Sequence, residues 1–206
     1  MTPRDWRTWH GEYDQAGSRL QRRLAVVQQC IRAALDALPS GPIRAISLCA
    51  GEGRDLLGVL ADHARAKDVV ARLVELDPEL AKSARRAAPA GVEVICGDAA
   101  RTDACAGAVP ADLVLVCGVF GNVSDADVER TVRTVPSLCA PGAFAIWTRH
   151  RRAPDLTVDI RRWFRECGFE QIEFVGPDDL LFGVGMNRLS GPPAPFEPGV
   201  RMFTFR

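Results

Sequence analysis

Five short apolar segments, separated by helix-like segments, restrict the fold of this chain more than any other feature. They read "IRAISLCAG", "VVARLVELD", "VEVICGD", "ADLVLVCGVFG" and "GAFAIWTRH". Each is almost continuous in Val, Ile and Leu, which is typical of strands that are buried on both faces. The intervening segments, such as "RDLLGVLADHAR" and "PELAKSARRAA", have apolar residues at helical spacing. This alternation of strand and helix predicts a parallel sheet with helices on both faces.

The remainder of the chain predicts further elements at both ends. Near the C-terminus, "TVDIRRWFRECGF" predicts a helix that ends at Gly168, and "EQIEFVG" and "RMFTF" predict two strands joined by the loop "SGPPAPFEPG". A strand pair with this connection indicates an antiparallel strand at the edge of the sheet. We therefore predict a doubly wound α/β domain at residues 41–206, with a mostly parallel seven-stranded sheet and an antiparallel last strand. Residues 1–40, with the helix-like "SRLQRRLAVVQQCIRAALDAL", are predicted to form an N-terminal helical cap.

Composition excludes several classes of function. The chain has 206 residues, and its 26 basic and 26 acidic side chains leave no net charge to attract nucleic acid. Its apolar runs are too short to span a membrane, and its first residues lack the apolar core of a signal peptide. The seven cysteines form no CxxC pair, and several lie in apolar runs, which indicates buried thiols rather than disulfides or a metal site. We therefore expect a cytoplasmic protein without a metal centre.

The turn after the first strand, in "RAISLCAGEGRDLLGVL", is the first candidate binding feature. Gly51 and Gly53 end the strand and open a helix, where backbone N–H groups can meet a ligand. A nicotinamide-binding fingerprint needs a third glycine where Leu56 stands, and a P-loop needs a Gly-Lys pair that the sequence lacks. The turn therefore disfavours both a nicotinamide oxidoreductase and a P-loop enzyme.

Two carboxylates follow the next two predicted strands. Glu75 ends the second strand and Asp98 the third, so both lie at the edge of the sheet where open α/β folds bind ligands. A carboxylate at the first position can accept the hydroxyls of a ribose. The alternatives are that Glu75 lies on the surface and that Asp98 caps the turn that follows it. Asp77, which precedes Pro78, is predicted to cap the next helix.

These features together resemble the motifs of class I S-adenosylmethionine-dependent methyltransferases, over about residues 40–206. The glycine turn, "VELDPEL", "CGDAA" and "LVCGVFGNV" are similar to four successive motifs of that family. The resemblance implies that Glu75 binds the ribose of S-adenosylmethionine, that Leu76 packs on the adenine and that Asp98 bonds the adenine amino group. The residues that it implies for the cofactor site are Cys49, Ala50, Gly51, Gly53, Glu75, Leu76, Asp98, Ala99, Cys117, Gly118 and Phe120.

The sequence departs from the family pattern in its first motif. The family usually has an acidic residue where Ser47 stands and a glycine where Cys49 stands. These departures leave open how the amino group of the cofactor is held. They also keep a non-catalytic S-adenosylmethionine-binding module as an alternative. Cys117 is interpreted as a small core residue rather than a nucleophile, because neither a Pro-Cys pair nor a base is adjacent.

The fourth motif bears on the acceptor. "CGVFGN" lacks both the [D/N]-P-P-[Y/F] run of enzymes that methylate nucleobase and glutamine amino groups and the Pro-Cys of cytosine-C5 enzymes. This favours in-line transfer to an O or N atom of a small molecule. The alternative is an RNA methyltransferase that uses the basic stretch Arg149–Arg165, although "RHRRAPD" at its start is interpreted as a solvated loop. If a general base is used, the candidates are His10, Tyr13 and His150.

The expected cover over the site is small. It would consist of residues 1–40 and the loop at 176–199. A homodimer is therefore one arrangement that would complete the site.

Overall fold

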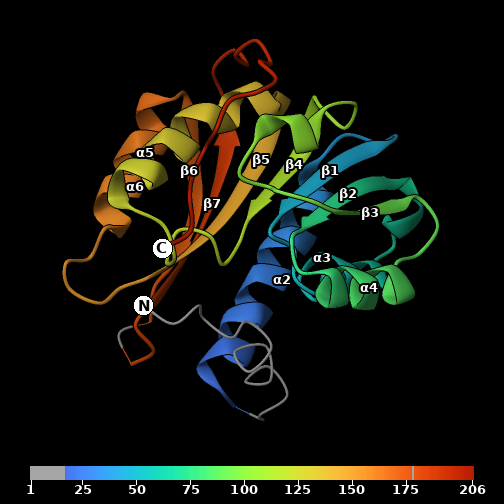
Figure 1. Ribbon diagram of the computed structural model, residues 1–206, viewed down its shortest axis with the longest axis horizontal. Coiled ribbons are helices and arrows are strands. Elements are labelled where there is room, and N and C mark those ends of the chain that lie inside the picture. The colour runs from blue at the N-terminus through green and yellow to red at the C-terminus, as the bar shows by residue number, and fades with distance from the viewer. Residues whose placement is uncertain (1–16, 178) are drawn as a thin grey trace.

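The computed structural model describes residues 17–177 and 179–206 (Figure 1). Seven strands form one sheet in the order β3-β2-β1-β4-β5-β7-β6, in which β7 is antiparallel to both of its neighbours and the other pairs are parallel. This confirms the predicted fold class. The strands are β1 (Ile43–Leu48), β2 (Val69–Glu75), β3 (Val92–Cys96), β4 (Ala111–Val116), β5 (Cys139–His150), β6 (Phe169–Val175) and β7 (Phe182–Leu189).

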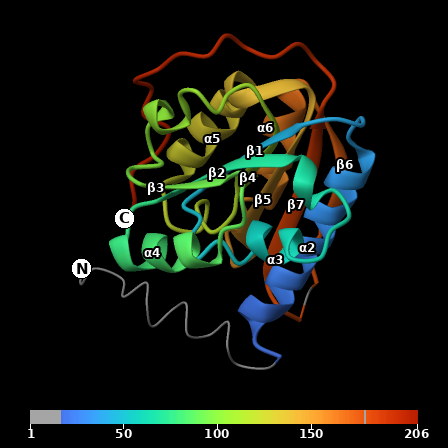
Figure 2. The same cartoon turned by 90° about the vertical axis from the view of Figure 1, so that its right-hand side faces the viewer.

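Helices cover both faces of the sheet. Figure 2 shows α2, α3 and α4 on one face and α5 and α6 on the other. Ile31 of α2, Val59 of α3 and Ala84 of α4 are buried in one apolar cluster, and Val128 of α5 and Ile160 of α6 in a second one. The chain is thus doubly wound around the sheet. The helices are α2 (Arg19–Ala37), α3 (Leu56–Leu60), α4 (Pro78–Ala87), α5 (Asp125–Thr134) and α6 (Thr157–Glu166).

The last strand differs from its prediction. "RMFTF", at residues 201–205, forms only isolated bridges to Arg101 and Val123. The antiparallel strand is instead β7, which lies within the predicted loop at 176–199. The two glycines of "FGVGMNRL" have a low strand propensity, so the sequence pattern does not indicate a strand there. Gly185 is required by packing, because a Cβ atom there would lie 2.3 Å from the ring of Trp147 on β5. The prediction of a strand at 201–205 was therefore wrong.

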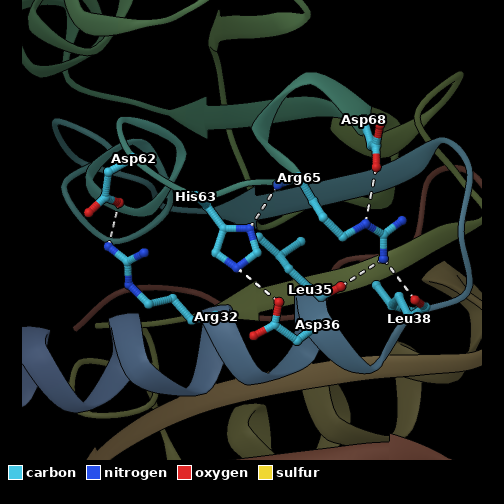
Figure 3. A network of polar contacts seen from close by, with 8 residues as sticks. All are labelled: Arg32, Leu35, Asp36, Leu38, Asp62, His63, Arg65 and Asp68. Atoms are coloured by element: carbon cyan, nitrogen blue, oxygen red, sulfur yellow. Dashed lines mark hydrogen bonds and ion pairs between the residues drawn. The ribbon is translucent and has the colours of Figure 1, made fainter.

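The helix expected within residues 1–40 is present as α2. The Ser18 side chain accepts a hydrogen bond from the N–H of Gln21, which caps the helix start. The far end is held by Arg65, whose guanidinium donates to the carbonyl oxygens of Leu35 at 2.8 Å and Leu38 at 2.7 Å (Figure 3). The buried face of α2 makes this helix a layer of the core. Whether residues 1–40 also act as a cap stays a prediction.

Candidate functional site

A cavity of about 350 Å³ lies at the carboxyl ends of β1, β2, β3 and β4. Its volume is within the usual range for small-molecule sites. The N-terminal half of α2 forms part of its wall through Arg23, Leu24 and Val27. The described residues that line it are Arg23, Leu24, Val27, Cys49, Ala50, Gly51, Glu52, Arg54, Asp55, Glu75, Leu76, Asp77, Leu80, Asp98, Ala99, Cys117, Gly118 and Phe205.

The glycine turn is built from three residues in the left-handed region of backbone conformation. Cys49, Gly51 and Gly53 have φ angles of 54°, 57° and 73°. A Cβ atom at Gly53 would lie 2.7 Å from Leu73, so only glycine fits there, and Gly53 supports the turn from behind the cavity. A residue with a Cβ atom loses about 1–2 kcal/mol in this conformation. The geometry therefore explains why a glycine is usual where Cys49 stands.

Glu75 links this turn to the end of β2. Its side chain is buried, with 8% exposed, and its Oε2 accepts a hydrogen bond from the N–H of Gly51 at 2.7 Å. Its Oε1 accepts a second one from the N–H of Asp77 at 2.8 Å. The alternative that Glu75 is a surface carboxylate is therefore wrong. Because an ionised carboxylate has about four lone-pair sites, it can accept further bonds from a ligand in the cavity.

The other two acidic residues at this edge also bond to the backbone. The Oδ1 atom of Asp98 accepts a hydrogen bond from the N–H of Ala100 at 2.9 Å, so the predicted turn cap is present. Its Oδ2 lies 3.6 Å from Arg201, and the half-exposed side chain also lines the cavity. Asp77 caps α4 as predicted, by accepting from two N–H groups of the first turn at 2.8 and 3.1 Å.

Besides Asp77, four charged residues outside the predicted set line the cavity, namely Arg23, Glu52, Arg54 and Asp55. Glu52 and Arg54 pair with each other at 2.7 Å. Asp55 caps α3, with its Oδ1 accepting from the N–H of Leu56 at 2.8 Å, and it is 9% exposed. Burial raises the pKa of this carboxyl above its ordinary value, and the charge of Arg23 opposes the rise. The available signal was an aspartate directly before an apolar helical run, which indicates a cap but does not by itself predict a ligand contact.

Only some of the residues after β4 that the family resemblance implies for the cofactor site line the cavity. Cys117 and Gly118 line the cavity, whereas Phe120 is fully buried with its ring centroid 6.1 Å from that of Trp147. Burial raises the pKa of the Cys117 thiol well above its ordinary value. This thiol is therefore protonated at neutral pH, which agrees with the interpretation that Cys117 is not a nucleophile. Cys117 is only partly buried and lines the cavity, so it is not simply a core residue.

The candidate bases are not brought together in the described part of the chain. His10 and Tyr13 lie outside the described residues. His150 ends β5 beside Gly121 and does not line the cavity, and its buried Nδ1 has no hydrogen-bond partner among the described residues. Burial and then the charges of neighbouring arginines lower the pKa of His150, so the ring is neutral at pH 7. A role as a base stays a prediction.

The basic stretch is less solvated than expected. Arg149 is 8% exposed, donates to the carbonyl oxygen of Phe120 and lies 3.5 Å from Asp125. Arg151 pairs with Asp155 at 3.2 Å. The interpretation of "RHRRAPD" as a solvated loop was therefore wrong for Arg149, which lies within β5. Arg151 follows β5 in the loop and is partly buried.

Neither a metal cluster nor a membrane helix is found in the described ranges. Residues 17–177 and 179–206 contain no group of three or more His, Cys, Asp or Glu side chains placed to hold a metal ion. None of the helices in these ranges has the length and apolar character needed to cross a membrane.

Comparison with known proteins identifies the architecture. No family model and no curated protein matches the sequence. Among solved structures, the N-methyltransferase NodS from Bradyrhizobium japonicum WM9, in complex with S-adenosylhomocysteine, matches with a TM-score of 0.63 at 15% identity, over 90% of this chain and 98% of NodS. Magnesium protoporphyrin IX methyltransferase (ChlM) from Synechocystis PCC 6803, with bound S-adenosylmethionine, matches with a TM-score of 0.64 at 13% identity, over 89% of this chain and 90% of ChlM. The chain has the class I methyltransferase fold.

A third match has a longer chain. An O-methyltransferase family protein from Burkholderia thailandensis matches with a TM-score of 0.63 at 17% identity, over 83% of this chain but only 56% of its own. Identities this low establish the class I methyltransferase fold alone. The function must therefore be inferred from the residues that line the cavity.

Proposed function

We propose that the chain is an S-adenosylmethionine-dependent methyltransferase that transfers a methyl group to an O or N atom of a small molecule by in-line displacement. The buried carboxylate of Glu75 carries the proposal. It faces a cavity of suitable volume and is already oriented by the N–H groups of Gly51 and Asp77. A carboxylate fixed in this way can accept both hydroxyls of a ribose without rearranging.

The other cavity residues fit the adenosine part of the cofactor. Leu76 is 62% exposed at the cavity, which suits an apolar contact with the face of an adenine ring. Asp98 keeps an exposed carboxylate oxygen near this end, which can accept a hydrogen bond from the adenine amino group.

Asp55 and Arg23 fit the amino-acid part of S-adenosylmethionine. The position of the usual acidic residue is occupied by Ser47, which is 1% exposed within β1. Asp55 instead brings a carboxylate to the cavity from the N-cap of α3, and Arg23 brings a positive charge from α2. These opposite charges complement the ammonium and carboxylate groups of a methionine. We therefore assign the amino group of the cofactor to Asp55.

The protein has limited chemistry to perform in such a reaction. The bound cofactor supplies a methyl group on a positively charged sulfur. The chain orients the reactants and excludes water, for which the apolar Leu24 and Val27 of α2 are suitably placed. The protonated thiol of Cys117 does not compete as an acceptor. If the acceptor must lose a proton, the candidate bases stay His10, Tyr13 as its phenolate, and His150. His150 is neutral but does not line the cavity, so it would have to act on an acceptor that extends beyond the lining residues.

Two alternatives remain to be separated from this proposal by experiment. The RNA methyltransferase is weakened because Arg149 and Arg151 make contacts within the fold. The purified protein would be incubated with methyl-labelled S-adenosylmethionine and either the small-molecule or the RNA fraction of a cell extract. We expect label in the small-molecule fraction and none after omission of the protein. Label in RNA would favour the RNA enzyme. Cofactor binding without label in either fraction would favour a non-catalytic module.

A further inference from the structure

The segment at residues 200–206 joins two loops that border the cavity. The N–H of Met202 donates to the carbonyl oxygen of Ala100, in the loop after β3, at 2.8 Å. The N–H of Arg206 donates to the carbonyl oxygen of Asn122, in the loop after β4, at 3.0 Å. In Figure 1 this segment, in red, descends past α5 to the mark at the C-terminus. The segment therefore bridges the loop after β3 and the loop after β4 on the α5 side of the sheet.

Its position is fixed by the core and by α5. Met202 and Phe203 are fully buried. The N–H of Thr204 donates to Oδ2 of Asp127 in α5 at 3.2 Å. The Phe203 ring contacts that of Phe205 edge to face, with centroids 5.4 Å apart. Phe205 is thus held in place by its neighbours on both sides of the chain.

Phe205 lines the cavity from this fixed segment. It is the one aromatic side chain among the lining residues that the structure describes, and 37% of it is exposed. Leu76, which lines the same cavity from the end of β2, is 62% exposed. Asp98 and Ala99 also line it, and Asp98 lies 3.6 Å from Arg201 of the same C-terminal segment. Two exposed apolar surfaces beside an acceptor oxygen match a flat ring with a polar edge, such as a purine.

We propose that Phe205 binds the adenine ring of the cofactor and that residues 200–206 therefore form part of the cofactor site. This inference rests on the proposed function. Contact with the ring would bury aromatic surface that is exposed in the free protein. It would also link cofactor binding to the loops after β3 and β4, because the segment bonds to both.

The test measures ligand affinity by titration calorimetry in the full chain. The ligands are S-adenosylhomocysteine and 5′-methylthioadenosine, which share the adenosine but differ in the amino-acid part. Phe205→Ala should weaken the binding of both by similar factors, about tenfold or more. Phe205→Trp should retain most of the affinity, and its fluorescence should change when either ligand is added. Phe196→Ala is the matched control, because Phe196 packs against the core from the same C-terminal region without lining the cavity.

Each outcome has a distinct meaning once circular dichroism shows that the variants are folded. Equal affinity of Phe205→Ala and wild type would overturn the inference alone. So would a loss for S-adenosylhomocysteine without one for 5′-methylthioadenosine, since the ring would then lie at the amino-acid end. An equal loss in Phe196→Ala would mean that the region was merely loosened, which also overturns it. If the folded wild type binds neither ligand, the proposed function is wrong and this inference falls with it.

Discussion

The carboxylate of Glu75 accepts a hydrogen bond from the backbone N–H of Gly51 at 2.7 Å. β1 and β2 pair in parallel up to Leu48 and Val74, and the Glu75 side chain continues this contact beyond the last paired residues. The bond joins the end of one strand to the glycine turn that follows its neighbour. The carboxylate that we propose binds the ribose is therefore already oriented in the free protein. A substitution of Glu75 should alter the conformation of the turn as well as the affinity for the cofactor.

Asp55→Asn should make the protein more stable and bind its cofactor less well. Because burial raises the pKa of Asp55 in the folded state, its ionised form opposes folding once the pH is above the value of an unfolded aspartate, about 3.9. Asparagine keeps the cap without the charge. Urea unfolding at pH 7 should show a gain in stability that disappears below about pH 4. The affinity for S-adenosylhomocysteine should fall by about tenfold or more.

Two results would contradict this assignment. One is a loss of stability in Asp55→Asn at pH 7. The other is unchanged affinity for S-adenosylhomocysteine, which would remove Asp55 from the cofactor site.

Cys49→Gly should be more stable than Cys49→Ala. Alanine keeps the loss of about 1–2 kcal/mol that a Cβ atom causes at a φ of 54°, whereas glycine removes it. Glycine also increases the entropy of the unfolded chain, which opposes the gain by about 0.5–1 kcal/mol. The expected difference in the free energy of unfolding is therefore about 0.75 kcal/mol in favour of glycine from the middle of the two ranges, and up to about 1.5 kcal/mol. An alanine variant that equals or exceeds the glycine variant in urea unfolding would show that the turn is not strained.

Arg65→Lys should destabilise the fold by about 2 kcal/mol or more, since hydrogen bonds from a charged group contribute strongly and lysine lacks the planar fork. In Figure 3 the guanidinium reaches carbonyl groups at the end of α2 and also Asp68, at 3.0 Å. Arg32→Lys is the matched control. Arg32 pairs with exposed Asp62, and such surface pairs contribute less than about 1 kcal/mol. Equal effects of the two substitutions on urea unfolding would refute the capping role of Arg65.

Acid should weaken the attachment of the C-terminal segment. Burial tends to raise the pKa of Asp127, but hydrogen bonds from Ser124, the N–H of Thr204 and Arg130 outweigh it and lower the pKa below its ordinary value. The stability from this carboxylate is therefore present above about pH 3.9 and is lost as the pH falls through the lower folded value. Wild type should be more stable than Asp127→Asn at neutral pH, with the difference shrinking in acid. If the difference in the free energy of unfolding between wild type and Asp127→Asn does not change with pH, the ionisation of Asp127 does not stabilise the fold.

The sequence predicted most strands of the sheet, and which residues meet at its carboxyl edge, because both depend on local patterns. Continuous apolar runs identify buried parallel strands, and parallel strands bring their carboxyl ends to one edge. The glycine turn, Glu75 and Asp98 can therefore be placed together from the order of residues alone. The adjacent pair Asp77 and Pro78 likewise identifies a helix start without any knowledge of distant contacts.

The features that the sequence did not predict depend on tertiary packing. β7 forms by pairing with β5 and β6, and Gly185 leaves room for the ring of Trp147, so the strand depends on residues distant in the chain. Phe205 reaches the cavity because its segment bonds to two loops far from it in sequence. Asp55 is identified as a cap by its neighbours, but only the fold shows that it is buried beside a cavity.

The most direct measurement is titration calorimetry of the wild type, Glu75→Gln and Glu79→Gln with S-adenosylmethionine, S-adenosylhomocysteine and NAD. Glu79 is an exposed carboxylate in the first turn of α4, outside the cavity lining, and serves as the control. We expect the wild type and Glu79→Gln to bind the first two ligands alike and not to bind NAD. Glu75→Gln should bind about tenfold to a few hundredfold more weakly. Absence of binding to the folded wild type, or equal binding by the two variants, would contradict the role of Glu75 as the cofactor ligand.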